Sequence, residues 1–191
     1  LEIVKAGASY QCFAPNIAQL HVVNHLTGEV EETETRNVLV ESARIARGEI
    51  KAVDELNISE FDALVIPGGF GAAKNLCSFA VSGAEHQVEP SVKDFISQFA
   101  VKHKPVGFIC IAPIMIPQLY GQGVSGTIGS DAGTAAAFDL QGGQHKAVGV
   151  HEIVVDEEHK VVSTPAYMLA ADIVEAHSGI SKLIEKVLQM A

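Results

Sequence analysis

The sequence has little positive charge, no long apolar run and no paired cysteine motif, and each absence excludes a class of protein. Its 191 residues carry 13 basic and 23 acidic side chains, a formal net charge of −10. This argues against a nucleic-acid-binding surface, because such surfaces need basic patches. No apolar run approaches the roughly 18–20 residues that cross a bilayer. We therefore expect neither a nucleic-acid partner nor a membrane span.

Disulfide and metal-binding patterns are also missing. The three cysteines, Cys12, Cys77 and Cys110, are an odd number without C-x-x-C spacing. They fit neither a disulfide framework nor a zinc site, and they suit a reducing compartment such as the cytoplasm. The eight histidines form no H-x-H or H-E-x-x-H pair. The sequence therefore predicts no metal centre.

A composition of 48% hydrophobic and 19% charged residues predicts one domain, residues 1–191, with a sizeable core. Leu1–Gly7 is typical of the end of a helix closed by glycine. A helix that starts in its middle predicts further chain before Leu1. An organelle-targeting segment in that further chain is the alternative to a cytoplasmic location.

Short apolar runs alternate with helical patterns, which is typical of a mostly parallel sheet with helices on both faces. The clearest strands are Phe61–Pro67 and Val106–Ile109, and the polar stretch 16–36 predicts a long loop. Further strands are expected at residues 9–13, 124–128, 152–155 and 161–163, and helices at residues 37–48 (with Asn37 as N-cap), 89–103, 112–119, 132–140 and 167–190.

Cys110 follows the strand Val106–Ile109 and precedes the expected helix from Ala112. At a sharp turn from strand to helix, the helix dipole favours a negative charge, and the thiolate is the reactive form of cysteine. We interpret Cys110 as a candidate nucleophile. The alternative is that it is a buried small hydrophobe, as most free cysteines are.

A glycine-rich turn, Gly68–Gly71, follows the strand Phe61–Pro67. Ligands of open parallel sheets bind outside the carboxyl ends of the strands, so this turn and Cys110 should meet at one edge. If the N–H groups of Gly69 and Ile111 both face the thiolate, they form an oxyanion hole. A tight turn without a catalytic role is the alternative.

Gly68 and Asn75 belong to the same stretch and are predicted to contact the substrate. The spacing of its glycines satisfies neither G-x-x-x-x-G-K-[ST] nor G-x-G-x-x-G, so no nucleotide cofactor is expected. The His-x-Glu pair that a glutaminase needs on a late strand end is also missing, because Thr164-Pro165-Ala166 stands in that place.

Two stretches carry a family resemblance: Pro67–Leu76, with the sequence PGGFGAAKNL, and Gly107–Pro113, with the sequence GFICIAP. They resemble the ElbB-type proteins, once called sigma cross-reacting or enhancing-lycopene-biosynthesis proteins. That group belongs with PfpI and the parkinsonism-associated deglycase in the class I glutamine amidotransferase-like superfamily. Further matching stretches lie at residues 12–15, 24–28, 35–39, 41–48, 127–129 and 163–167.

The resemblance implies a flavodoxin-like α/β three-layer sandwich with a nucleophile elbow at Cys110. It implies a glutathione-independent, cofactor-free glyoxalase-type lyase acting on 2-oxoaldehydes, and a homodimer. Relatives place a glutamate after their first strand, which no residue of this chain matches. The resemblance therefore also implies that the family's amino-terminal strand lies outside residues 1–191. PfpI-type relatives have His where this chain has Ile111.

Two classes of function remain open at this point. The first is the glyoxalase-type lyase, with Cys110 as nucleophile and with Gly69 and Ile111 as N–H donors. The second is a redox-sensing or ligand-binding protein in which Cys110 is oxidised or alkylated without turnover. A glutaminase is the weakest hypothesis.

Overall fold

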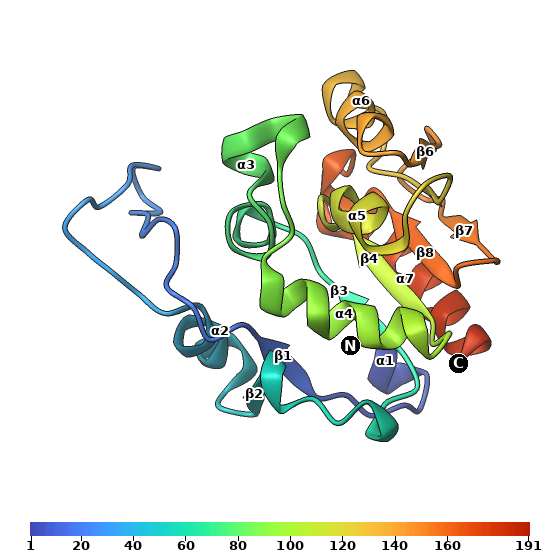
Figure 1. Ribbon diagram of the computed structural model, residues 1–191, viewed down its shortest axis with the longest axis horizontal. Coiled ribbons are helices and arrows are strands. Elements are labelled where there is room, and N and C mark those ends of the chain that lie inside the picture. Colours follow the sequence, from blue (N-terminus) through green and yellow to red (C-terminus); the bar gives the residue numbers. More distant parts are fainter.

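The computed structural model describes all residues from 1 to 191, and its main sheet has four strands in the order β3-β4-β8-β7 (Figure 1). β3 (Leu64–Ile66), β4 (Val106–Ile109) and β8 (Val161–Thr164) are parallel neighbours. β7 (Val154–Asp156) pairs antiparallel with β8. The predicted strands at residues 61–67, 106–109, 152–155 and 161–163 are confirmed, and the last two form an antiparallel pair.

Two smaller sheets lie beside the main one. β1 (Cys12–Ala14) pairs in parallel with β2 (Ile50–Ala52), and β5 (Ser125–Gly126) pairs in parallel with β6 (Gln144–His145). β1 and β5 are shorter than the expected strands at 9–13 and 124–128. No ladder joins β1 to β3, so the β1-β2 pair is separate from the main sheet.

Seven α-helices surround these sheets, and none of them is long and apolar enough to cross a bilayer. Asn37 caps the helix that follows it by accepting a hydrogen bond from the Val40 N–H, as its sequence predicts. The helices are α1 (Glu2–Lys5), α2 (Val38–Ala46), α3 (Phe79–Ser82), α4 (Pro90–Val101), α5 (Ile116–Tyr120), α6 (Ala132–Leu140) and α7 (Ile173–Met190).

The side chains of β4 and β8 divide between two apolar clusters, one on each face of the sheet. Val106 and Phe108 pack with α4 in the larger cluster, whereas Ile109 and Val162 pack with α7 in the smaller one. This alternation follows from the two-residue period of a strand. Figure 1 shows α4 and α7 on opposite sides of the sheet, which confirms the three-layer α/β arrangement.

The segment after Cys110 differs from the predicted continuous helix at 112–119. Residues Ala112–Met115 form a 3-10 helix, and α5 begins only at Ile116. Pro117 has no N–H to donate to the carbonyl of Pro113, which instead accepts the N–H of Ile116 three residues on. The backbone therefore winds more tightly than an α-helix directly after the candidate nucleophile.

The stretch from residue 16 to residue 36 contains no helix or strand, as predicted. In Figure 1 it extends from the body of the molecule on the side of α2. Its contacts include two isolated bridges, Ala18 with Asn37 and Val23 with Val30. The Leu20 N–H of this stretch also donates a hydrogen bond to the side chain of Asn75, which follows the glycine-rich turn.

Candidate active site

Cys110 occupies a strained turn directly after β4. Its φ is +65°, in the left-handed region that residues with a Cβ rarely adopt. Its backbone N–H donates to the Thr164 carbonyl at 3.0 Å, which ties the turn to the end of β8. Ala166, just after β8, also has a positive φ of +43°. Strained non-glycine residues cluster at functional sites, and these two follow the ends of adjacent strands.

Gly68 packs against the Cys110 turn more closely than any other residue type could. A Cβ built on Gly68 would lie 2.7 Å from the Ile109 carbonyl oxygen, 2.8 Å from Cys110 Cβ and 2.9 Å from Ile111 N. Such distances are far inside ordinary van der Waals contact. The glycine-rich turn and Cys110 therefore meet at one edge of the sheet, as the sequence predicts.

Two backbone N–H groups beside this contact have no acceptor within the chain. The N–H of Gly69 and the N–H of Ile111 donate no hydrogen bond, although the Gly69 carbonyl accepts two and the Ile111 carbonyl accepts one. Gly69 has a φ of +94°, which glycine adopts without strain. The two donors belong to the residues that directly follow Gly68 and Cys110, the pair in close contact.

The chain after the glycine-rich turn forms a π-helix at Ala72–Leu76, a rare form that is frequent at functional sites. Asn75, a predicted substrate contact, uses its Oδ1 to accept the Leu20 N–H at 2.9 Å. That oxygen therefore holds the 16–36 loop, and a role of Asn75 in substrate binding stays a prediction.

Two other side chains of this segment differ sharply in exposure. Phe70 is 80% exposed, and the Lys74 ammonium lies 5.6 Å from the centre of its ring. Cys77 is buried and directs its thiol to the Ala72 carbonyl, and burial raises the pKa of this thiol. Cys110, in contrast, is half-buried.

Further hydrogen bonds fix the neighbouring strand end. The buried Ser163 hydroxyl accepts the Thr127 N–H at 3.0 Å, and the Thr164 hydroxyl donates to the Glu152 carbonyl at 2.9 Å. The first of these bonds joins the matching stretches 127–129 and 163–167. The sequence indicated both stretches but not that they contact each other.

A buried histidine contacts the backbone of the 3-10 helix that follows Cys110. His86 is fully buried, with Nδ1 3.0 Å from the Gly83 carbonyl and Nε2 3.2 Å from the Ile114 carbonyl. Burial lowers the pKa of His86, although the contacts with Gly83 and Ile114 oppose this shift. The imidazole thus bridges the segment before α4 and the 3-10 helix after Cys110.

A large cavity of about 1410 Å³ reaches the site from the side of β1. Gly68, Phe70 and Asn75 are among its lining residues, whereas Cys110 is not. Cys110 therefore lies beyond the end of this cavity, across the Gly68 backbone.

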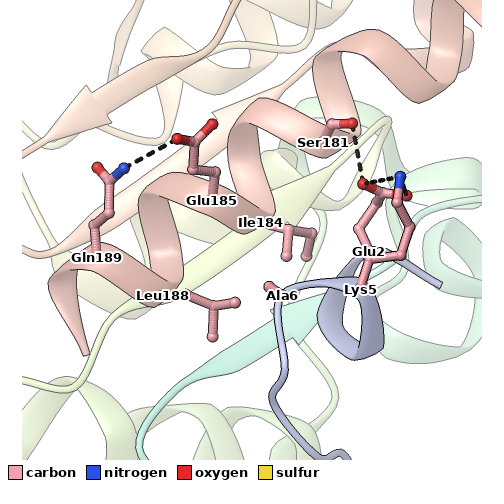
Figure 2. Close-up of a pocket in the computed structure, with 8 residues that line it drawn as sticks. All are labelled: Glu2, Lys5, Ala6, Ser181, Ile184, Glu185, Leu188 and Gln189. Atoms are coloured by element: carbon pink, nitrogen blue, oxygen red, sulfur yellow. Dashed lines mark hydrogen bonds and ion pairs between the residues drawn. The ribbon is translucent and has the colours of Figure 1, made fainter.

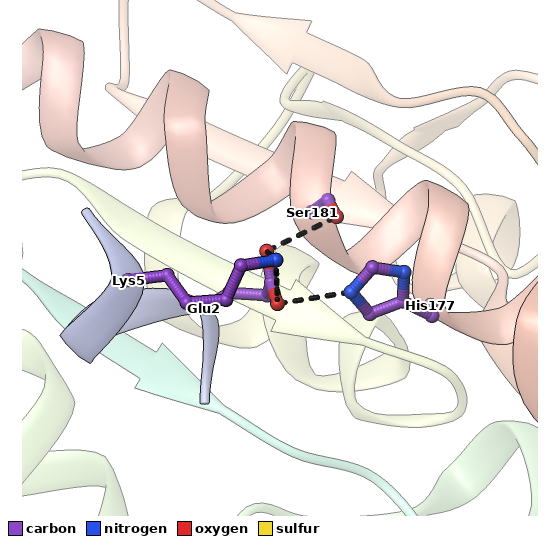
Figure 3. A network of polar contacts seen from close by, with 4 residues as sticks. All are labelled: Glu2, Lys5, His177 and Ser181. Carbon is purple, nitrogen blue, oxygen red and sulfur yellow. Dashed lines mark hydrogen bonds and ion pairs between the residues drawn. The ribbon is translucent and has the colours of Figure 1, made fainter.

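A second cavity, of about 440 Å³, lies between α1 and α7 (Figure 2). Glu2 is at its edge and joins the two helices, because its carboxylate contacts Lys5, His177 and Ser181 at distances of 2.9–3.3 Å (Figure 3). The hydrogen bonds from His177 and Lys5 hold the pKa of Glu2 at about 2. These contacts pin α1 onto α7.

Comparison with known proteins identifies the family of this chain. No protein-family model matches the chain. The chain is 41% identical over 199 residues to the "ES1 protein homolog, mitochondrial" of Rattus norvegicus, covering 100% of this chain and 74% of that protein. The same identity and coverage hold for the "Glutamine amidotransferase-like class 1 domain-containing protein 3, mitochondrial" of Homo sapiens. The chain belongs to the ES1 family of class 1 glutamine amidotransferase-like proteins.

A solved structure supports the assignment of this chain to the ES1 family. It is the "isoprenoid biosynthesis protein with amidotransferase-like domain" of Ehrlichia chaffeensis, with a TM-score of 0.90 and 34% identity over 99% of this chain and 86% of that one. Drosophila melanogaster DJ-1beta and Candida albicans glyoxalase III share the fold alone, with TM-scores of 0.52 and 0.51 at 17% and 13% identity. The predicted ElbB-type family and flavodoxin-like fold are confirmed.

Proposed function

We propose that this ES1-family protein is a glutathione-independent glyoxalase-type lyase that converts 2-oxoaldehydes such as glyoxal and methylglyoxal to hydroxy acids. The observation that carries the proposal is the Cys110 turn. A half-buried thiol sits on a strained elbow that packs against Gly68, and the residues that follow Gly68 and Cys110 each have an N–H without an acceptor. An aldehyde bound there would place its developing oxyanion beside the N–H groups of Gly69 and Ile111.

The proposed reaction begins when the Cys110 thiolate adds to one aldehyde carbon of glyoxal and forms a hemithioacetal. The hydrogen of that carbon leaves as a proton, and a proton is returned to the neighbouring carbonyl carbon through an enediol. The first carbon is thereby oxidised to a thioester, while the second is reduced to an alcohol. Water then hydrolyses the thioester, which releases glycolate and the free thiol. The sequence is redox-neutral, so it needs no electron acceptor.

The proton transfer needs an acid–base group, which contributes typically 10²–10⁴-fold to such steps. No residue among 1–191 is assigned this role, because none matches the family's glutamate. The predicted contacts of Gly68 and Asn75 with substrate, and the predicted homodimer, belong to the proposal as well.

A redox-sensing protein is the competing proposal. The partial exposure of Cys110 favours it, because accessible thiols are the ones that peroxide oxidises. Such a protein would form sulfenic or sulfinic acid at Cys110 and would not consume aldehydes.

The experiment that separates the two measures glyoxal and methylglyoxal consumption by the purified protein without glutathione. Glycolate and lactate are quantified by NMR. Stoichiometric formation of hydroxy acid over many turnovers supports the lyase. Absence of turnover, together with ready formation of sulfinate at Cys110 under mild peroxide, overturns the lyase in favour of the sensor.

The cytoplasmic location stays a prediction. The rat and human relatives are named as mitochondrial, which favours a mitochondrial location for this protein as the alternative. Fractionation of cells that express the complete reading frame decides between the two.

A further inference from the structure

Two buried polar atoms of the 16–36 loop have no hydrogen-bond partner. They are Gln19 Oε1 and His21 Nδ1, and the Tyr120 hydroxyl is the only other buried side-chain nitrogen or oxygen of the chain in this state. Buried polar groups in proteins are nearly always hydrogen-bonded, so an unpartnered one calls for an explanation. Gln19 and His21 both line the cavity of about 1410 Å³. A ligand in this cavity can supply both missing partners.

The chemistry of the two atoms restricts what such a ligand is. Gln19 Nε2 donates to the His21 carbonyl at 3.3 Å, so the free end of this side chain is Oε1, which only accepts hydrogen bonds. His21 Nδ1 donates when it carries the imidazole hydrogen. The pair therefore suits a ligand that presents a hydroxyl to Gln19 and an acceptor oxygen to His21.

Two hydrogen bonds join this part of the loop to the start of α2 and to the segment after the glycine-rich turn. The Gln19 N–H donates to the Arg36 carbonyl at 2.8 Å, and the Leu20 N–H donates to Asn75 Oδ1 at 2.9 Å. Lys74 directly precedes Asn75 in the π-helix and lines the same cavity. The backbone segments of Gln19, His21 and Lys74 are thus held together at one part of the cavity wall.

Lys74 supplies a positive charge there without an acidic partner. Its side chain is half-buried and forms no ion pair with a carboxylate. The ammonium lies 5.6 Å from the centre of the Phe70 ring, and a ring face takes up none of its three N–H donors in an ordinary hydrogen bond. In a chain with a net charge of −10, this half-buried cation is available to the negative charge of a ligand.

The acidic residues that line the cavity do not compete for this charge. Glu41 is ion-paired with two arginines at 3.0 and 3.7 Å. Glu60 and Asp62 come before the amino end of β3, whereas Lys74 follows its carboxyl end. The electrostatic environment beside Lys74 therefore favours an anion.

We propose that Lys74, His21 and Gln19 form a binding site for a small 2-hydroxycarboxylate such as lactate or glycolate. The Lys74 ammonium and the His21 Nδ1–H donate to the carboxylate, and Gln19 Oε1 accepts the hydroxyl of the acid. Hydrogen bonds to an ionised group are roughly twice as strong as neutral ones, so the carboxylate contributes most of the affinity. Hydroxy acids are also the products of the lyase reaction proposed above, but the site stands whether or not this protein makes them.

The test is an NMR titration of the protein with sodium lactate, followed at the His21 ring and at the side-chain amide of Gln19. Both signals should shift saturably. Propionate lacks the hydroxyl and should bind about 5-fold more weakly than lactate, because one neutral hydrogen bond is lost. Lactamide lacks the charge and should bind at least about 10-fold more weakly.

Variants of Lys74 test the role of its charge. Lys74→Gln should weaken lactate binding at least about 10-fold, because it removes the charge and keeps a polar chain. Lys74→Arg keeps the charge and should bind lactate nearly as well as the wild type, which separates loss of charge from loss of folding. Lys93→Gln is the control, because Lys93 is exposed on α4 and does not line the cavity. It should bind lactate as the wild type does.

Three results overturn the proposal. If lactate leaves the signals of His21 and Gln19 unmoved, these two atoms are solvated by water only. If propionate binds as tightly as lactate, Gln19 does not recognise a hydroxyl. If Lys74→Gln and Lys93→Gln bind lactate equally well, the charge of Lys74 does not hold the carboxylate. None of these readouts requires catalysis, so the lyase proposal and this one can fail separately.

Discussion

The backbone of Gly68 lies so close to Cys110 that the space between them has no room for a Cβ. A methyl group on Gly68 would lie 2.8 Å from Cys110 Cβ and 2.7 Å from the Ile109 carbonyl oxygen. The ends of β3 and β4 are thus in close contact at the candidate nucleophile. The geometry of the Cys110 turn depends on Gly68, which lies 42 positions earlier in the sequence.

The first prediction is that Gly68→Ala distorts the Cys110 turn. We expect it to cost about 1–3 kcal/mol of unfolding free energy, because the neighbouring backbone has to shift. The rate at which thiol reagents modify Cys110 should also differ between Gly68→Ala and the wild type. Gly71→Ala is the matched control, because Gly71 is helical and has nothing within 4 Å of an added Cβ. Equal stability and equal thiol reactivity in both variants would contradict the close approach.

The second prediction concerns which cysteine reacts. Cys77 is 4% exposed and burial raises the pKa of its thiol, whereas Cys110 is half-buried on the elbow. Iodoacetamide should therefore modify Cys110 well before Cys77 under native conditions. Peptide mass spectrometry over a time course measures both rates, and Cys77→Ser should leave the rate at Cys110 unchanged. Modification of Cys77 as fast as Cys110 would be inconsistent with the structure.

The third prediction is that Asn75→Ala loosens the 16–36 loop. Its Oδ1 accepts the Leu20 N–H at 2.9 Å, and a lost hydrogen bond of this type costs about 1 kcal/mol. Limited proteolysis should cleave the loop faster in Asn75→Ala. Asn75→Asp keeps an acceptor oxygen and should resemble the wild type. If all three proteins are cleaved at one rate, Asn75 does not hold the loop.

The fourth prediction is a loss of stability on acidification through His86. Burial lowers the pKa of His86 in the folded state, so the unfolded chain binds the proton more readily. The contribution of His86 is therefore complete above its unfolded pKa of about 6.5 and is lost as the pH falls below that value. One proton of difference corresponds to a slope of about 1.4 kcal/mol per pH unit.

Urea unfolding between pH 7.5 and pH 5.5 measures this slope. In His86→Gln the slope should be shallower than in the wild type by up to about 1.4 kcal/mol per pH unit, the equivalent of one proton. An unchanged slope in His86→Gln would show that this imidazole is not the group that titrates.

Local signals in the sequence were sufficient for the elements that build the site. Two prolines bracket β4, a glycine pair follows β3, and Asn37 marks the start of α2. Proline restricts the backbone at its own position, glycine permits a sharp turn, and Asn37 caps a helix, so the strand ends and the Cys110 turn could be predicted. The family resemblance added the fold that the structure and the relatives then confirmed.

Features that depend on distant contacts could not be predicted in this way. The tie between Asn75 and Leu20 spans 55 residues, and the contact of His86 with Ile114 spans 28. The prediction of a continuous helix after Cys110 was wrong. Pro117 has no N–H to donate to the Pro113 carbonyl one turn earlier, so residues Ala112–Met115 form a 3-10 helix. The pairing of β1 with β2 and of β3 with β4 depends on contacts between distant segments, so no single stretch of sequence predicts that β1 and β3 lie in separate sheets.

The most direct test of the central claim compares turnover of glyoxal by the wild type and by Cys110→Ser, with Cys77→Ser as the matched control. The account predicts that Cys110→Ser loses hydroxy-acid formation by at least about 100-fold while its thermal stability is retained, because the nucleophile alone is removed. Cys77→Ser should stay close to the wild type. Equal rates of glyoxal consumption in the wild type and in Cys110→Ser would contradict the account.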